Sequence, residues 1–269
     1  MARKRSWIVA LLVELGAWLK NIHVVFTNGG HGEEYVNKDA VYPYVLAVKR
    51  ICAEMARAFK DDAVEVVAAP AVGGVALEQW VAYALSKMTG RQVLGVYVEK
   101  PRHSLCKAKK GEQIPYTLVL EIPSSNGNQT VKPVTVRGVL LPEQELIIED
   151  GSRVVFGRGY ADLVKGRRVL VAEDVLNTGG TVEKTVNAVE DAGGRVVGVT
   201  AVFNRGGVTA EKLGVPVLDA MVDVQMENWP QGECPLCAQD VPIHTGIGHG
   251  KQFLAQKEAA AKAAARSAS

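Results

Sequence analysis

The stretch Arg168-Val-Leu-Val-Ala-Glu-Asp-Val-Leu-Asn-Thr-Gly-Gly-Thr-Val182 combines a strand, a glycine turn and the start of a helix. Its branched apolar run, Val169 to Ala172, is typical of a strand buried on both faces of a parallel sheet. Glu173 and Asp174 follow at the strand end, where open α/β sheets bind their ligands. The glycines of residues 177–181 let backbone N–H groups turn inward ahead of the helix. This order predicts a phosphate site, because unpaired N–H groups and the helix dipole both favour an anion.

A sugar phosphate fits this arrangement better than a nucleotide alone. Carboxylates accept hydrogen bonds, so Glu173 and Asp174 suit the two hydroxyls of a ribose while the following loop takes its 5-phosphate. The motif Gly-x-x-x-x-Gly-Lys-Ser/Thr is absent, and Gly-x-Gly-x-x-Gly does not follow this strand. The alternative interpretation is an ordinary strand–helix turn with a capping threonine.

The stretch closely resembles the signature that binds 5-phosphoribosyl 1-pyrophosphate (PRPP) in the type I phosphoribosyltransferases. That signature is an apolar strand, two acids, two apolar residues and then Thr-Gly-x-Thr, and the matching residues here are Glu173, Asp174, Thr178, Gly179 and Thr181. The resemblance implies an α/β fold with a central, mostly parallel sheet flanked by helices, an N-terminal hood and a β-hairpin insertion. It also implies transfer of a 5-phosphoribosyl group between PRPP and a nitrogenous base, with pyrophosphate release and Mg²⁺. In this scheme Glu173 and Asp174 act at the reacting ribose, and the PRPP-binding loop comprises Val175, Asn177, Thr178, Gly179, Gly180 and Thr181.

Length and composition are compatible with such an enzyme. The 269 residues suit a single α/β domain at about 1–254, with a hood at about 20–42, an insertion at about 101–155 and an Ala/Lys-rich tail at 255–269. A net charge of +2 does not favour nucleic acid as the partner. Four scattered cysteines are too few for a disulfide framework, which favours a reducing, cytoplasmic location.

The N-terminal segment predicts an amphipathic helix from about Trp7 to Lys20. Basic residues precede an apolar run there, as in a signal peptide, but Glu14 interrupts the run and its length is far below that of a membrane span. We therefore expect no membrane partner.

Two further segments supply candidate PRPP contacts. A strand at His23 to Phe26, a glycine turn and a return at Tyr35 resemble the hood of the orotate enzymes, with Lys38 as its candidate cation or, alternatively, a solvated lysine. Many orotate enzymes have Lys-Ser-Gly at this turn, where this chain has Thr27-Asn28-Gly29. After a strand at Val64 to Ala69, Gly73 and Gly74 match the family's pyrophosphate loop, although close helix packing also explains two glycines.

Basic residues after the strand Val93 to Val98 match the start of the family's mobile loop. Lys100, Arg102 and His103 are the candidates to neutralise a departing pyrophosphate, Lys100 with a catalytic role, and a solvated basic run is the alternative. Residues 114–155 then alternate in a way that predicts two to four antiparallel strands. Arg158, beyond them, is a further phosphate candidate.

An arginine after a later strand favours orotate as the base. Arg205 follows the strand Arg195 to Val202, in a setting similar to that of an arginine that pairs with the carboxylate of orotate in the orotate enzymes. A loop arginine that caps a helix is the alternative. A purine or another base, or a non-catalytic PRPP-sensing regulator, remain rival functions. The resemblance also implies a homodimer.

A cysteine pair near the C-terminus has a zinc-like spacing. Cys234 and Cys237, with His244 and His249, read as Cys-x2-Cys-x6-His-x4-His. The spans do not match the usual zinc motifs closely, and a small apolar turn is the favoured interpretation.

Overall fold

The computed structural model describes residues 5–107, 113–122, 132–141, 145–149 and 153–267. It divides the chain into two compact units, one formed by Met1–Glu99 with Phe156–Ser269 and the other by Lys100–Val155. The second unit spans the segment that we expected to be an insertion.

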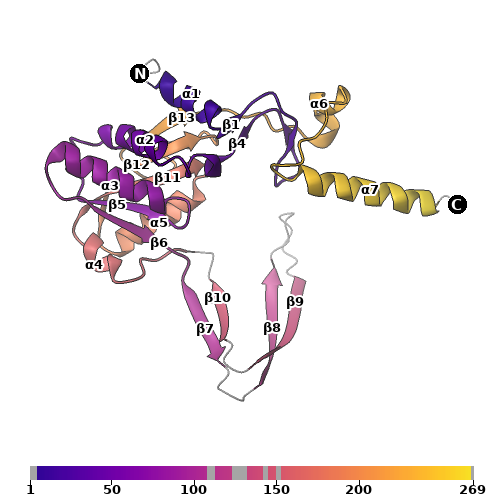
Figure 1. The fold of residues 1–269 in the computed structure, drawn as a ribbon. Coiled ribbons are helices and arrows are strands. Elements are labelled where there is room, and N and C mark those ends of the chain that lie inside the picture. Colours follow the sequence, from indigo (N-terminus) through magenta and orange to yellow (C-terminus); the bar gives the residue numbers. More distant parts are fainter. Residues whose placement is uncertain (1–4, 108–112, 123–131, 142–144, 150–152, 268–269) are drawn as a thin grey trace. The chain divides into compact units, whose positions relative to one another are not determined.

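A five-stranded parallel sheet forms the centre of the first unit (Figure 1). Its strand order is β13-β12-β11-β5-β6, and each neighbouring pair runs parallel. The strands are β5 (Val66–Pro70), β6 (Leu94–Val98), β11 (Arg168–Leu176), β12 (Arg195–Asn204) and β13 (Leu218–Asp223). Since helices lie between β5 and β6 and between β11 and β12 in the chain, this parallel sheet confirms the predicted α/β class.

Strand β11 separates two apolar cores, because successive side chains of a strand point to opposite faces. Val169 and Val171 pack in one core with valines of α5 (Gly180–Asp191), while Leu170 and Ala172 pack in the other with α2 (Val45–Arg57) and α3 (Val75–Thr89). All four β11 residues have no exposed surface. The apolar run was therefore correctly interpreted as a strand buried on both faces, and the short helix α4 (Tyr160–Val164) adds Val164 to the α5 side.

The N-terminal helix is shorter than predicted. Helix α1 spans Ser6–Glu14 and does not continue to Lys20. Gly16 adopts φ +68° and Ala17 donates to the carbonyl oxygen of Leu12 at 2.8 Å, which ends the helix in a turn. Trp18 then begins a strand instead of a further helical turn.

Four strands of two residues each form the hood, and they pair antiparallel. β1 (Trp18–Leu19) pairs with β4 (Tyr35–Val36), and β2 (Val24–Val25) pairs with β3 (His31–Gly32). A 3-10 helix (Lys38–Ala40) follows. The strand, glycine turn and return expected for residues 23–36 are thus present.

The second unit contains two antiparallel strand pairs among its described residues. β7 (Arg102–Lys107) pairs with β10 (Glu145–Glu149), and β8 (Ile114–Ile122) pairs with β9 (Lys132–Leu140). This agrees with the antiparallel strands predicted there.

The C-terminal segment of the first unit is mainly irregular and helical. A 3-10 helix (Gln231–Glu233), α6 (Pro235–Ala238) and α7 (Gly250–Ser267) follow β13. Helix α7 covers most of the segment predicted to be a frayed helix or tail. Among the helices in the described residues, none combines the length and the apolarity that crossing a bilayer requires.

A buried acid on α3 makes the stability of the first unit depend on pH. Glu78 has no exposed surface, and burial raises the pKa of its carboxyl group to about 7, although a hydrogen bond from Gln79 opposes the shift. This pKa lies above the ordinary value of 4.5 for glutamic acid, so the protonated carboxyl group favours the folded state. That contribution to stability is complete below about pH 4.5 and is lost as the pH rises through 7.

We therefore expect Glu78→Gln to raise the free energy of unfolding above pH 7 by about 3 kcal/mol, at about 1.4 kcal/mol per pKa unit. The gain should shrink toward zero near pH 4.5, as measured by urea unfolding across that range. The same change at exposed Glu190 on α5 is the control. A gain that does not depend on pH would contradict this interpretation of Glu78.

Candidate functional site

Glu173 and Asp174 lie near the carboxyl end of β11 and line a cavity of about 360 Å³. Both are buried, with 5% and 7% of their surface exposed. The hood, the loop after β5 and the loop after β11 supply the other walls of this cavity. Its lining residues are Tyr35, Val36, Asn37, Lys38, Asp39, Pro70, Ala71, Val72, Gly73, Val175, Asn177, Thr181 and Arg205.

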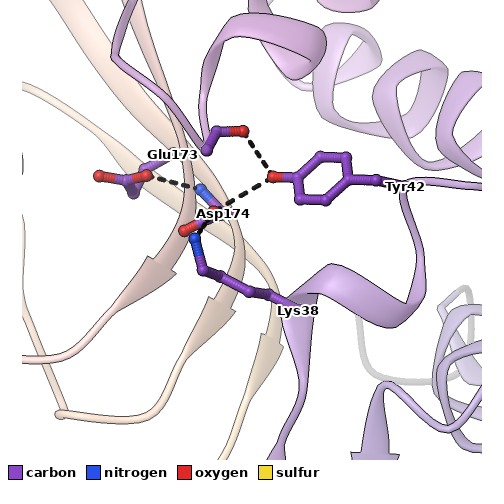
Figure 2. Close-up of polar contacts among 5 residues, drawn as sticks. Lys38, Tyr42, Glu173 and Asp174 are labelled. Atoms are coloured by element: carbon purple, nitrogen blue, oxygen red, sulfur yellow. Dashed lines mark hydrogen bonds and ion pairs between the residues drawn. The ribbon is translucent and has the colours of Figure 1, made fainter.

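Asp174 is the centre of a polar network that joins three segments (Figure 2). The Lys38 ammonium group donates to Asp174 Oδ2 at 2.8 Å. The Tyr42 hydroxyl donates to the Gly73 carbonyl oxygen at 2.5 Å and lies 3.1 Å from the same Asp174 oxygen. The network therefore links the hood and the loop after β5 to the central strand.

The charges around Asp174 shift the pKa values of its partners. For Lys38, burial opposes the charged form, but the hydrogen bond and the negative charge of Asp174 outweigh burial and raise the pKa. Burial and the charge of Asp174 raise the pKa of Tyr42 well above its ordinary value. Lys38 is thus a cation at the cavity wall, and Tyr42 is a neutral donor to Gly73 and Asp174 beside it.

Glu173 is a buried acid whose pKa is shifted by its surroundings. Burial, together with the adjacent negative charge of Asp174, raises its pKa to about 8. The backbone N–H of Asp174 donates to Glu173 Oε1 at 2.9 Å, which offsets only part of the cost. A ligand that donates hydrogen bonds or carries positive charge would relieve this pair of acids.

The 177–181 loop forms a second cavity, of about 110 Å³, which shares Glu173 and Val175 with the first. Gly179 adopts φ +85° and precedes the first residue of α5, Gly180, so the loop turns directly into a helix N-terminus. Thr178, Gly179, Gly180 and Thr181 all line this cavity. Unpaired first-turn N–H groups and the helix dipole make it suitable for a phosphate group.

The loop after β5 brings its backbone against the acid pair. A Cβ atom added to Gly73 would meet the Asp174 carboxylate and the Lys38 ammonium group. A Cβ atom added to Gly74 would meet Ala69 and the Pro70 carbonyl oxygen, so Gly74 serves close packing at the start of α3. The Ala71–Val72 peptide bond in this loop is cis.

Arg205 lies where the first cavity meets a third, of about 520 Å³. Its Nε–H donates to the Asn177 side-chain oxygen, and its backbone N–H donates to the Leu176 carbonyl oxygen at 3.0 Å. Burial lowers the pKa of Arg205. The third cavity is lined by Phe26, Thr27, Asn28, Tyr35, Asn177, Thr178, Arg205, Gly206, Met226, Asn228, Gly248 and His249.

Two of the predicted basic residues, Lys100 and Arg158, are not among the described residues that line the three cavities. Arg158 instead lies 4.0 Å from a Glu99 carboxylate oxygen and over the ring of Tyr97. Lys100 is exposed at the start of the second unit, and Arg102 and His103 lie in β7 of that unit. Their roles stay predictions.

The histidines beside the cysteine pair are not the ones that the spacing suggested. Cys234 and Cys237 lie with His23 and His31 from the hood. His244 instead accepts a hydrogen bond from the backbone of Gly246, and His249 contacts Gln252. The zinc-like spacing therefore named other histidines than the two that lie beside the cysteine pair, because the chain folds back on the hood and His244 and His249 make other contacts.

Sequence reasoning did not select Tyr35 and Asn37, which line the first cavity, or Tyr42, which bonds to the lining residues Gly73 and Asp174. Tyr35, Asn37 and Tyr42 come from the hood and the turn after it. No local pattern marks Tyr42, because its partners lie 31 and 132 residues away. Tyr35 and Asn37 could have been selected because they lie close in sequence to Lys38, which was already a candidate.

Comparison with known proteins agrees with this geometry. Residues 39–235 match the family model of the phosphoribosyl transferase domain. The chain is 27% identical to the orotate phosphoribosyltransferase of Pelotomaculum thermopropionicum over 238 residues, which cover 88% of this chain and 94% of that protein. It is 25% identical to the orotate phosphoribosyltransferase of Caldanaerobacter subterraneus subsp. tengcongensis over 221 residues, 82% of this chain and 86% of that protein.

A solved structure supports the same fold. The orotate phosphoribosyltransferase of Mycobacterium tuberculosis H37Rv, crystallised with Fe(III) dicitrate, superposes with a TM-score of 0.51 and 21% identity, covering 82% of this chain and 96% of that chain. Since the family model spans most of the sequence and the parallel sheet matches, the chain belongs to the phosphoribosyltransferase family.

Proposed function

We propose that the protein transfers the 5-phosphoribosyl group between PRPP and orotate. In the direction of nucleotide formation, a ring nitrogen of the base bonds to C1 of the ribose, and the C1–oxygen bond to pyrophosphate breaks. The observation that supports the proposal is a group of three cavities that share lining residues: the acid pair lines the first, the 177–181 loop forms the second, and Arg205 lines both the first and the third.

The proposed position of PRPP follows from the chemistry of each wall. The carboxylates of Glu173 and Asp174 accept hydrogen bonds from the ribose hydroxyls, and the amides of residues 177–181 bind the 5-phosphate. Lys38 and the backbone around Gly73 line the first cavity next to Asp174, where they suit the pyrophosphate. As C1 becomes cation-like, the negative field of the acid pair favours the developing charge.

The residues present also fit Mg²⁺. This ion prefers carboxylate and phosphate oxygens, and Glu173 and Asp174 place two adjacent, buried carboxyl groups at the cavity wall. Glu173 and Asp174 would hold the ion together with PRPP oxygens, and the bound ion neutralises the charge of the polyphosphate.

Orotate is the proposed base because the third cavity offers both a carboxylate partner and flat apolar walls. A guanidinium group pairs with a carboxylate in geometry and in charge. Phe26, Tyr35 and Met226 supply apolar surface for a planar ring, and Asn28 and Asn228 supply amide groups for its ring substituents. Two of the curated relatives, at 25% and 27% identity, carry the name orotate phosphoribosyltransferase.

The experiment that tests this function is steady-state pyrophosphate release with PRPP, Mg²⁺ and a panel of bases. We expect turnover with orotate and little with uracil, adenine, hypoxanthine or guanine. Turnover with a purine and not with orotate would show that the substrate is a purine. PRPP binding without turnover on any base would favour a non-catalytic regulator.

Asp174→Asn should raise the KM for PRPP by about 10- to 100-fold, because hydrogen bonds to charged groups contribute about 1.5–3 kcal/mol. The amide keeps the shape of the carboxylate, so the circular dichroism spectrum and the melting temperature should change little. Asp219→Asn is the matched control, since that carboxylate pairs with Arg5 at 2.7 Å and lines none of the three cavities. An unchanged KM for PRPP in Asp174→Asn would remove Asp174 from the ribose site.

Arg205→Ala should lower kcat/KM for orotate by about 10- to 100-fold, on the same energy scale for a charge-assisted pair. The comparison base is uracil, which lacks the carboxylate of orotate, and its low activity should not fall further. Arg57→Ala is the control for loss of a cation outside the cavities, since Arg57 pairs with Glu54 on α2 and lines none of the three cavities. Equal losses for orotate and uracil would refute a carboxylate-binding role for Arg205.

A further inference from the structure

Four side chains with metal-binding chemistry meet on the hood, outside the proposed PRPP site. His23 and His31 come from either side of the hood turn, and Cys234 and Cys237 come from the segment around α6. One ligand atom from each residue lies within 4.8 Å of all the others. Cys234 and both histidines are buried, and Cys237 is half-buried. Residues more than 200 positions apart in the chain thus supply one compact group of two thiols and two imidazoles.

The distances approach those of a tetrahedral zinc site. His23 Nε2 lies 3.6 Å from Cys234 Sγ and 3.7 Å from Cys237 Sγ, and His31 Nδ1 lies 3.4 Å from Cys237 Sγ. Zinc bonds of about 2.3 Å to sulfur and about 2.0–2.1 Å to nitrogen place ligand atoms about 3.4–3.8 Å apart at the corners of a tetrahedron. The two histidine nitrogens, 2.8 Å apart, would separate by about 0.5 Å to reach that geometry.

A second set of contacts orients the ligands. His23 Nδ1 lies 2.7 Å from the Val241 carbonyl oxygen, so its N–H donates there and Nε2 presents a lone pair to the group. The backbone N–H of Cys237 donates to Cys234 Sγ at 3.4 Å. That contact also caps α6, with Pro235 in its first turn. These hydrogen bonds therefore hold His23 Nε2 and Cys234 Sγ near each other, with the His23 lone pair directed into the group.

The surrounding backbone fixes the two halves of the group to each other. His31 and Trp229 exchange backbone hydrogen bonds of 2.8 Å in both directions. The backbone N–H of His244 donates to the His23 carbonyl oxygen at 2.7 Å. The ring of Phe253, from α7, packs edge-on against His31 with 5.0 Å between the ring centroids. The ligands thus lie in a packed, largely enclosed setting.

We propose that His23, His31, Cys234 and Cys237 bind a structural zinc ion that fastens the C-terminal segment to the hood. Two thiolates and two imidazoles are ligands that zinc prefers, whereas magnesium and calcium prefer oxygen. Four protein ligands complete a tetrahedron, which is typical of a structural site and leaves no position for a substrate. Since Phe26, Thr27 and Asn28 lie between the two histidines in sequence and line the third cavity, the ion would also hold one wall of that cavity.

Metal analysis of the full-length protein tests this proposal. Protein purified without chelator and with a phosphine reductant should contain about one zinc ion per chain. After exchange with Co²⁺, the wild type should show the visible d–d bands of tetrahedral cobalt and a near-ultraviolet thiolate-to-cobalt band. Cys237→Ser and His31→Asn should each lower the affinity for zinc by at least about tenfold.

Matched variants separate this ligand set from the alternatives. Cys52→Ala removes a thiol in the core of the first unit, and the double variant His244→Asn with His249→Asn removes the histidines next to the cysteine pair in sequence. Both should keep the full zinc content. Loss of zinc in the double histidine variant, or retention in His31→Asn, would overturn the assignment of ligands.

The wild type alone can decide the question if the ligand variants do not fold. Less than about 0.1 zinc ion per chain after incubation with zinc, or a cobalt spectrum without a thiolate band, would overturn the proposal. So would a disulfide between Cys234 and Cys237 that persists in the reductant. These readouts need no substrate, so they remain valid whether or not the protein uses orotate.

Discussion

The ion pair between Lys38 and Asp174 is the contact on which the arrangement of the site depends. Two adjacent carboxylates at a buried strand end repel each other and lose hydration, and the raised pKa of Glu173 reflects that cost. Lys38 compensates Asp174 from the hood, while Tyr42 connects the same carboxylate to the backbone of Gly73. The acids that suit a ribose therefore also hold together the segments that suit its phosphates.

The parts of the fold visible in the sequence are those that depend on neighbouring residues. Strand β11 and its loop could be predicted, because an apolar run, two acids and a Thr-Gly-x-Thr pattern all lie within residues 168–182. The early end of α1 was also marked, by Gly16, and the helical periodicity was given too much weight. Tyr42 and the partners of the cysteine pair could not be found this way, since tertiary folding alone brings them to their contacts.

The two halves of the proposed site differ in how they are supported. The acid pair and the 177–181 loop lie on a five-stranded sheet with apolar cores on both faces, which is a rigid base for holding a ribose and its phosphate. Much of the third cavity instead consists of hood residues and of the irregular segment after β13. In the proposed function, specificity for the base would therefore depend on the less regular part of the first unit, whereas PRPP binding would depend on the sheet.

The weak support of the hood is a physical reason to expect a zinc ion there. Strands of two residues form few backbone hydrogen bonds, and isolated hairpins are at best marginally stable in water. Backbone hydrogen bonds to Trp229, His244 and His249 also support the hood. Because these residues are distant from the hood in sequence, the bonds must offset the entropy cost of closing the long loop between the two segments. A metal ion with ligands on both segments adds binding free energy to the same closure, because the ligands come together only in the folded chain. The proposed zinc ion thus lies where the sheet gives least support to the cavity proposed for the base.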